Sequence, residues 1–215
     1  MVLEFATALA LAQQCAPTVA PETLLSVVQV ESSFNPLAIN VNGAADPRPA
    51  RSKEEAVRVA SALIARGHSV DLGLAQINSK NLGWFGLSVA DAFDPCRNLA
   101  AAAKVLENGY VSAVRVAPQQ QALRMAFSAY NTGDHSRGFR NGYVAKVEAA
   151  ARRVVPALGG VYAGGGPTPA PSSHVQAALD AAAENLREPQ APAPEAPSWD
   201  VFGRSGGSGV HVFGR

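Results

Sequence analysis

The sequence predicts a mainly α-helical domain at residues 1–158, followed at 159–215 by a largely disordered tail rich in proline and glycine. In the first segment, alanines and other apolar residues recur at helical spacing, and strand-like alternation is scarce. The tail holds 7 of the 15 prolines and 10 of the 19 glycines. Because this composition leaves few apolar side chains to pack together, we expect no hydrophobic core there.

Residues that favour caps and turns place the helix ends. Starts are marked by Pro21, by Ser52 with Glu55 three residues later as a capping box, and by Asp94 before a proline. Stop signals follow several of the helical runs, at Asn35-Pro36, Gly67, Gly109 and Gly133. We therefore expect helices at residues 3–14, 21–33, 53–66, 97–108, 118–130 and 141–155.

The tail contains two further features. A short helix is expected at 173–187, where apolar residues share a helical face. The sequence Val-Phe-Gly-Arg occurs twice, at 201–204 and at 212–215. Apolar anchors at a disordered end are typical of docking motifs, and the alternative is an unstructured tail with chance similarity.

Composition narrows the classes of partner and cofactor. The net charge of +1 gives no reason to expect nucleic acid or acidic lipid. The four histidines have no metal-ligand spacing and no nucleotide-binding motif occurs, so we expect no metal and no cofactor. No apolar run approaches the length of a membrane span. The first residues are apolar, but Glu4 stands where a signal peptide carries a basic residue, so we expect an amphipathic helix there and no evident export signal.

The chain has two cysteines, Cys15 and Cys96. A disulfide between them would close a loop of roughly 80 residues and contribute about 4 kcal/mol in the chain-entropy model. Two unrelated buried thiols fit the sequence equally well, and the spacing does not decide between these readings.

Glu31 is a carboxylate on an otherwise apolar helical face. It follows Leu24, Val27 and Val28 at the spacing i, i+3, i+4, i+7. Burial disfavours the charged form of a carboxyl group, and a carboxylic acid that stays protonated near neutral pH suits proton donation to a glycosidic oxygen. The alternative is a glutamate at a helix end that faces solvent or a backbone amide.

Two later segments carry polar side chains suited to a sugar. In Gly73-Leu-Ala-Gln-Ile-Asn78, the glycine permits a tight turn, and the amides of Gln76 and Asn78 can bind sugar hydroxyl and acetamido groups. The segment Ala-Tyr-Asn-Thr-Gly ending at Gly133 is followed by Tyr143, and tyrosines offer an apolar wall with a polar tip. Each segment alone is equally consistent with an ordinary turn or helix end.

Taken together, these segments resemble a known family. ES-x-x-NP from Glu31, GL-x-QIN from Gly73, AYN-x-G from Ala129 and YV at Tyr143 are similar to the soluble lytic transglycosylases with lysozyme-like domains. The resemblance is closest to the branch associated with type IV secretion, and it covers residues 5–156. It implies a lysozyme-like catalytic domain.

The resemblance also implies a reaction. Glu31 would protonate the oxygen that links N-acetylmuramic acid to N-acetylglucosamine in peptidoglycan, and would then act as base on the C6 hydroxyl of the muramic acid. A 1,6-anhydro ring would form without water. Two carboxyl groups are usual in glycoside hydrolases, whereas this reaction needs one. Asp71 is the most credible second carboxylate, and we expect it to be structural, as a turn or cap residue.

By the same resemblance, Gln76 and Asn78 would line the sugar groove, and Tyr130, Asn131 and Tyr143 would lie near Glu31. Two further implications are that Ser33 positions Glu31 or the acetamido group, and that Cys15 and Cys96 form a disulfide. Residues 42–71 would form a lobe beside the groove. The expected location is the periplasm, the expected partners are glycan strands, and the tail would contact type IV secretion components.

Two other functions remain open. The first is a hydrolytic muramidase on the same fold. The second is a non-catalytic wall-binding assembly factor whose tail recruits secretion components.

Overall fold

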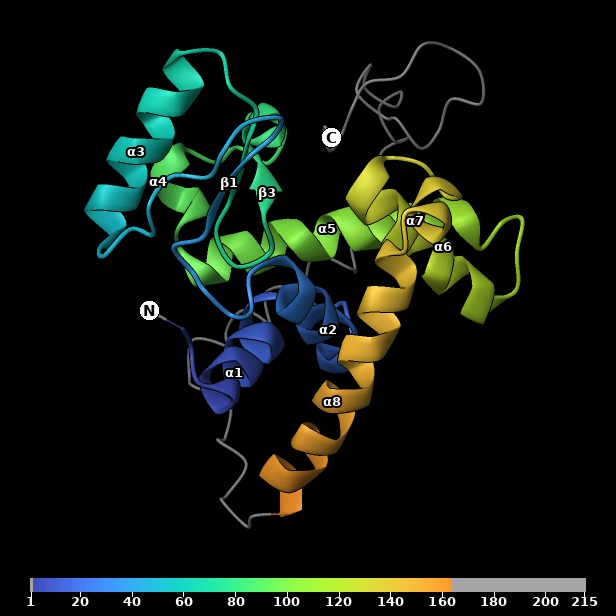
Figure 1. Cartoon of the computed structure of the whole chain (residues 1–215). Helices are drawn as coiled ribbons and strands as arrows, with labels where there is room; N and C mark the ends of the chain where they lie inside the picture. Colours follow the sequence, from blue (N-terminus) through green and yellow to red (C-terminus); the bar gives the residue numbers. More distant parts are fainter. Residues whose placement is uncertain (1, 164–215) are drawn as a thin grey trace, which may run out of the picture.

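The computed structural model describes residues 2–163 and confirms the prediction of a mainly α-helical fold (Figure 1). The expected helix at 173–187 and the two Val-Phe-Gly-Arg segments lie outside the described residues. The elements follow in the order α1 (Phe5–Cys15), α2 (Pro21–Glu31), β1 (Ile39–Val41), α3 (Lys53–Ala65), β2 (Val70–Leu72), β3 (Ile77–Asn78), η1 (a 3-10 turn, Ser79–Asn81), α4 (Val89–Ala92), α5 (Pro95–Ala113), α6 (Gln119–Thr132), α7 (Arg137–Arg140) and α8 (Tyr143–Ala163).

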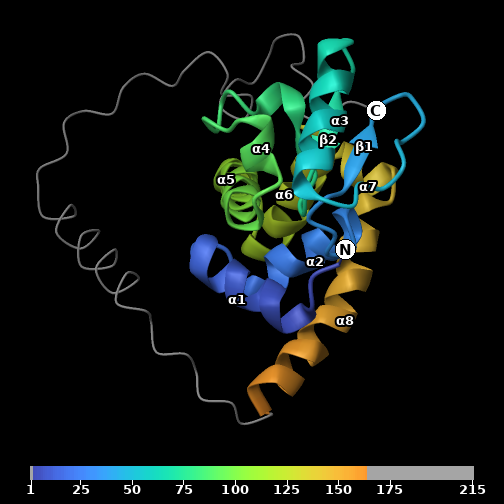
Figure 2. The same cartoon turned by 90° about the vertical axis from the view of Figure 1, so that its left-hand side faces the viewer.

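Helix α5 runs through the middle of the domain (Figure 1). The small sheet lies on one side of α5 together with α3 and α4, and α1 and α2 lie on the other side, as the second view also shows (Figure 2). Helix α6 packs along α5, and α8 packs along α2. The end of α2, the sheet and the start of α8 therefore come from distant parts of the sequence.

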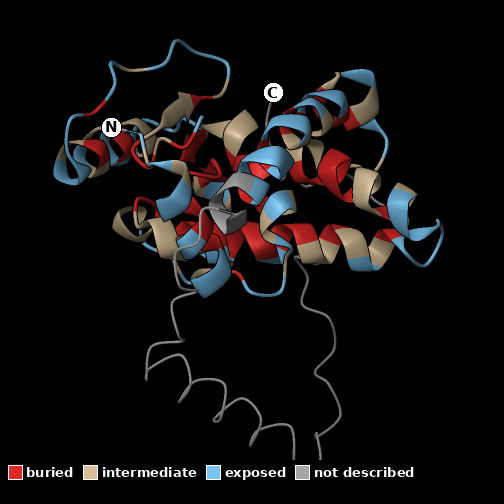
Figure 3. Ribbon diagram, turned by 90° about the horizontal axis from the view of Figure 1, so that it is seen from below, coloured by how far each residue is buried: buried red, intermediate tan, exposed pale blue. Residues whose placement is uncertain are grey.

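Residues of α2 and α5 form a large part of the hydrophobic core, and Figure 3 shows the buried residues gathered in the interior of the domain. Leu24, Val27 and Val28 of α2, which the sequence predicted to share a face, are all 0% exposed. Pro21 stands at the first position of α2, where its missing N–H and fixed φ favour a helix start. Glu31 is the last residue of this helix and is half-buried. The core therefore holds the helix rigidly up to the carboxylate.

The sheet is antiparallel, in the order β1-β2-β3. Its strands are two or three residues long, too short for alternation to reveal them in the sequence. The register pairs Asn40 with Asp71, and Asp71 with Asn78. Three polar residues from separate strands therefore lie in one row.

Gly109 does not end a helix, contrary to the sequence-based expectation. Helix α5 continues through it to Ala113. A Cβ atom at Gly109 would lie 3.3 Å from the Cα of Ala126, so the glycine permits close packing of α5 against α6. By contrast, the predicted stop at Gly133 is confirmed, because this residue caps α6 in the left-handed conformation with φ of 67°.

The last helix is also longer than expected. Helix α8 runs to Ala163 and contains Pro156, whereas the sequence suggested an end near residue 155. The short helices α4 and α7 were not predicted. None of the described helices is long and apolar enough to cross a membrane.

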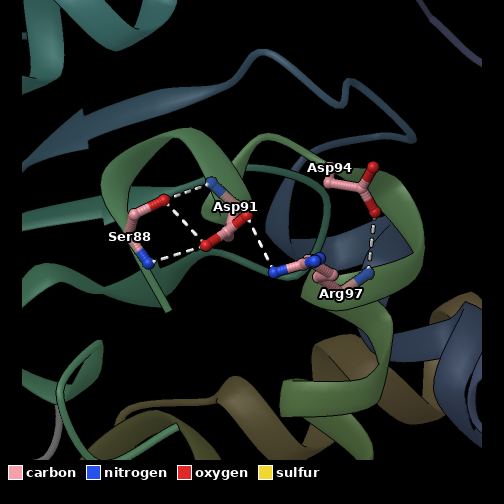
Figure 4. A network of polar contacts seen from close by, with 4 residues as sticks. All are labelled: Ser88, Asp91, Asp94 and Arg97. Carbon is pink, nitrogen blue, oxygen red and sulfur yellow. Dashed lines mark hydrogen bonds and ion pairs between the residues drawn. The ribbon is translucent and has the colours of Figure 1, made fainter. Parts of the chain in front are cut away.

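Ser52 caps the start of α3 as predicted, but the Glu55 carboxylate binds a different backbone N–H from the one expected in a capping box. Ser52 Oγ accepts a hydrogen bond from the Glu55 backbone N–H at 3.2 Å, while the Glu55 carboxylate accepts from the Arg51 N–H at 2.8 Å. A complete capping box occurs instead at Ser88 and Asp91 (Figure 4).

The start of α5 is fixed by polar contacts and a covalent link. Asp94 accepts a hydrogen bond from the Arg97 backbone N–H at 3.0 Å, and the Arg97 guanidinium lies 2.9 Å from Asp91 (Figure 4). Cys96, in the same turn, forms a disulfide with Cys15 at the end of α1. The link joins the two ends of a long stretch of chain that contains α2 and the sheet.

Candidate active site

A cavity of about 470 Å³ opens where α2, the sheet, α6 and α8 meet. Glu31, Ser33, Gln76, Asn131 and Tyr143, all predicted from the sequence as site residues, line it together. Asn78 and Tyr130 do not line it. The remaining lining residues are Val30, Ser32, Ala38, Ile39, Asn40, Asn42, Asp46, Asp71 and Lys146.

The turn after Glu31 has an unusual backbone. Ser33 and Phe34 have φ of 51° and 63°, in the left-handed region that residues with a side chain rarely adopt. Such conformations cost about 1–3 kcal/mol each and persist only where neighbouring structure enforces them. Here the Leu3 N–H donates to the Phe34 carbonyl at 2.9 Å, and the ring of Phe5 packs edge-on against Phe34 at 6.0 Å. The N-terminal segment thus supports the turn that follows the carboxylate.

Tyr143 contacts Glu31 directly. Its phenol donates a hydrogen bond to Glu31 Oε1. Burial of Tyr143, with the nearby charge of Glu31, raises the pKa of this phenol well above its ordinary value. The hydroxyl therefore keeps its proton at any physiological pH and acts as a donor to the carboxyl group.

Asn98 holds the turn at Gly73 in place. Gly73 has φ of 76°, and a Cβ atom there would lie 2.3 Å from the Ala92 carbonyl oxygen, so only glycine fits. The Asn98 side chain, 0% exposed, accepts from the Ala75 N–H at 2.8 Å and donates to the carbonyls of Leu72 at 2.9 Å and Ala92 at 2.7 Å. Asn98 was not among the predicted site residues, because its hydrogen bonds reach a segment far away in the sequence.

Gln76 lies in this same turn, and Tyr130 of α6 contacts it. Gln76 has φ of 54°, and its amide donates to the carbonyls of Gly73 at 2.9 Å and Ala38 at 3.3 Å. The Tyr130 hydroxyl donates to the Ala75 carbonyl at 2.7 Å from inside the core. Burial, with the charges of nearby carboxylates, raises the pKa of Tyr130 well above its ordinary value. Tyr130 thus supports the turn that presents Gln76 to the cavity.

Asp71 lies in strand β2, not in a turn or cap as we expected, and it lines the cavity with Glu31. Its carboxylate accepts hydrogen bonds from the side-chain amides of Asn78 at 2.6 Å, Asn42 at 3.0 Å and Asn40 at 3.3 Å. Three side-chain amides from β1, β3 and the turn after β1 therefore hold this carboxylate in position. The cavity therefore contains a second carboxylate in an organised polar environment.

Asn78 is placed behind Asp71 by the sheet register. Only 1% exposed, it also donates to Ser69 Oγ at 2.9 Å. Asn40 in β1 and Asn42 in the turn directly after it were not predicted, and both side-chain amides donate to the same oxygen, Asp71 Oδ2. No local pattern in the sequence identified them, because β1 is only three residues long and its pairing with β2 is not visible in the sequence.

Asn141 joins the two site residues of α6 and α8. Its amide nitrogen donates to Asn131 Oδ1 at 2.9 Å, and its amide oxygen accepts from the Tyr143 N–H at 3.0 Å. Ser33 also lines the cavity, and its hydroxyl donates to the Gln29 carbonyl at 3.4 Å. Among the described residues, no cluster of three or more histidine, cysteine or acidic side chains is arranged to bind a metal ion.

Comparison with known proteins identifies a family and several relatives. Residues 8–152 match the family described as Transglycosylase SLT domain. "Protein virB1" of Agrobacterium fabrum is 44% identical over 156 residues, which are 73% of this chain and 64% of that protein. "Type IV secretion system protein virB1" of Brucella abortus is 48% identical over 150 residues, 66% of this chain and 63% of that protein. The chain thus spans slightly less than two thirds of the length of these relatives. No solved structure matches.

Proposed function

This chain belongs to the transglycosylase SLT domain family, and from this premise we propose that it is a peptidoglycan lytic transglycosylase in which Glu31 is the catalytic acid and base. The observation that carries the proposal is the position of Glu31. It ends a buried helix, faces the cavity and accepts a hydrogen bond from a phenol that stays protonated. A proton donor in glycoside cleavage needs this combination of access to the sugar and fixed geometry.

In the proposed reaction, Glu31 transfers its proton to the oxygen that leaves C1 of N-acetylmuramic acid. Because Tyr143 donates to Oε1, we place the transferred proton on Oε2. The C1–O bond breaks, the C6 hydroxyl oxygen bonds to C1, and the proton of that hydroxyl returns to the Glu31 carboxylate. The products are a 1,6-anhydromuramic end and a free N-acetylglucosamine end, and no water is consumed.

The other predicted site residues have two proposed roles. Gln76, Asn131 and Ser33 line the cavity and bind hydroxyl or acetamido groups of the sugar. Asn78 and Tyr130 act from behind the cavity wall, through Asp71 and through the Ala75 carbonyl. This division follows from burial, since a side chain 1% exposed has no free surface for a sugar.

A hydrolytic muramidase is the second candidate, and Asp71 favours it. Retaining glycosidases combine a protonated carboxyl group with an ionised carboxylate, and Asp71 shares the cavity with Glu31 and carries three amide donors. In that reaction Asp71 would stabilise or attack C1, and water would complete the cleavage. The resulting reducing ends are heavier than anhydro ends by one water molecule.

Mass spectrometry of digested peptidoglycan separates the two reactions. The transglycosylase proposal expects anhydromuramic ends, and a majority of reducing muramic ends would refute it in favour of hydrolysis. An Asp71→Asn variant adds a second measurement, because hydrolysis through a covalent intermediate needs the carboxylate. Digestion by this variant at close to the parent rate would refute the hydrolytic candidate.

We further propose that the enzyme acts in the periplasm and opens the wall locally for a type IV secretion apparatus. Relatives with "type IV secretion system" in their names support this role. The alternative, a non-catalytic wall-binding factor, predicts that Glu31→Gln clears purified peptidoglycan as fast as the parent. The chain beyond Ala163 is proposed to contact secretion components, so deleting 164–215 should impair secretion in cells and leave turnover in vitro intact.

A further inference from the structure

We propose that Lys146 determines substrate preference by binding a carboxylate attached to the lactyl group of the muramic acid. This inference rests on the proposed peptidoglycan substrate and names one group of that substrate that the cavity recognises. No residue of the sequence motifs discussed above supplies such a contact.

Lys146 is placed at the cavity by helix α8. It follows Tyr143 by three residues, so the two side chains lie on the same side of the helix, and both line the cavity. The lining also includes the carboxylates of Glu31, Asp46 and Asp71. Lys146 is the only lysine or arginine among the residues that line this cavity.

The structure provides no other role for this ammonium group. Lys146 is exposed, and none of the ion pairs among the described residues includes it. Glu148, two residues further along α8, pairs instead with Arg124 at 2.7 Å. A cation in the first turn of a helix is also disfavoured by the helix dipole. The position is therefore better explained by a ligand than by helix stability.

The substrate supplies a matching anion on one of its two sugars. Muramic acid carries a lactyl group, which ends in a peptide stem with free carboxylates or, after the stem is removed, in its own carboxylate. N-acetylglucosamine carries no acid. The carboxylates of Asp46 and Asp71 in the cavity lining repel an anionic substrate, and one lysine offsets this repulsion at a single point. Such a contact distinguishes the two sugars and thereby the direction in which a strand binds.

The test compares Lys146→Met with Lys104→Met, an exposed helical lysine outside the cavity. The substrates are peptide-bearing strands, amidase-treated strands with a free lactyl carboxylate, and strands whose carboxylates have been amidated chemically. Lys146→Met should raise KM for carboxylate-bearing strands roughly fivefold, the upper range for an exposed ion pair. It should change kcat less than KM, and should leave the amidated strands unaffected. Lys146→Arg should restore the parent KM, since it keeps the charge.

Comparison of the three substrates shows which carboxylate Lys146 binds. An effect on peptide-bearing strands alone assigns a stem carboxylate, and an effect on amidase-treated strands assigns the lactyl carboxylate. Equal KM changes on all three substrates, or none, would overturn the inference. Calorimetric binding of the same strands to Glu31→Gln, with and without Lys146→Met, gives the result without turnover. If the parent does not cleave peptidoglycan but strand binding still depends on Lys146, the proposed reaction is wrong and this inference stands.

Discussion

The hydroxyl of Tyr143 donates a hydrogen bond to Glu31 Oε1 across a sequence separation of 112 residues. One residue ends α2 and the other begins α8, and these two helices pack along each other. The contact therefore depends on the packing of the helices and on the Asn141 amide that holds the Tyr143 backbone. It keeps one oxygen of the carboxyl group in place at the wall of the cavity.

Removing this hydroxyl should lower the rate and keep the fold. A hydrogen bond to a charged group is worth about 1.5–3 kcal/mol, so Tyr143→Phe should reduce kcat roughly ten- to hundredfold. The matched control is Tyr110→Phe, which changes a tyrosine outside the cavity. Release of soluble fragments from peptidoglycan measures kcat, and circular dichroism checks folding. An unchanged kcat in a folded Tyr143→Phe would show that the phenol does not assist Glu31.

Gly73 should be irreplaceable, and Gly43 provides the comparison. Both glycines have φ of 76°, but a Cβ atom at Gly73 would lie 2.3 Å from a backbone oxygen, whereas at Gly43 it would meet nothing within 4 Å. Gly43→Ala should cost only the left-handed conformation, about 1–2 kcal/mol. Gly73→Ala should add a steric clash and cost about 3–5 kcal/mol in total. Urea unfolding measures both, and equal losses would contradict the packing around Asn98.

Most of the helices and the position of Glu31 at the end of a buried helix face were predictable from the sequence, and the sheet was not. Apolar spacing on α2 identified both the buried face and the carboxylate at its end, because helical periodicity is a local signal. Asp71 shows the limit of such signals. Its amide partners come from Asn40, Asn42 and Asn78, and only the register of very short strands brings them together.

Gly109 and Lys146 show two other reasons why parts of the structure were not predicted from the sequence. A glycine inside a helix has the same local signature as one that ends it, and only the approach of Ala126 distinguishes them. Lys146 resembles any exposed helical lysine until the cavity beside it is known. The left-handed turn after Glu31 was also hidden, since it is enforced by the distant N-terminal segment.

Asp134 should make stability depend on pH in the acid range. Hydrogen bonds from the Ser136 side chain and from the backbone N–H groups of Ser136 and Arg137 lower the pKa of Asp134 from 3.8 to about 2. A lowered pKa contributes stability above the unfolded value of 3.8, and this contribution is lost as the pH falls through 2. Because the group is partly exposed, we expect about 1 kcal/mol after allowance for screening. The difference in unfolding free energy between the parent and Asp134→Asn should therefore shrink between pH 5 and pH 2, and a constant difference would contradict the assignment.

Phe5 should influence the rate through the strained turn and without touching the sugar. Its ring packs against Phe34, whose left-handed backbone follows Glu31 within three residues. Phe5→Ala removes this support, so the turn should relax and misplace the carboxyl group, with a roughly tenfold loss of kcat and little change in KM, as expected for a small displacement of a catalytic group. Leu9→Ala is the matched control, because it opens a cavity in the core one turn further along the same helix and leaves the Phe5 ring in place. Both variants should lose stability on thermal unfolding, and only Phe5→Ala should lose kcat well below its melting temperature. Equal rates for the two variants would mean that the N-terminal segment contributes stability alone.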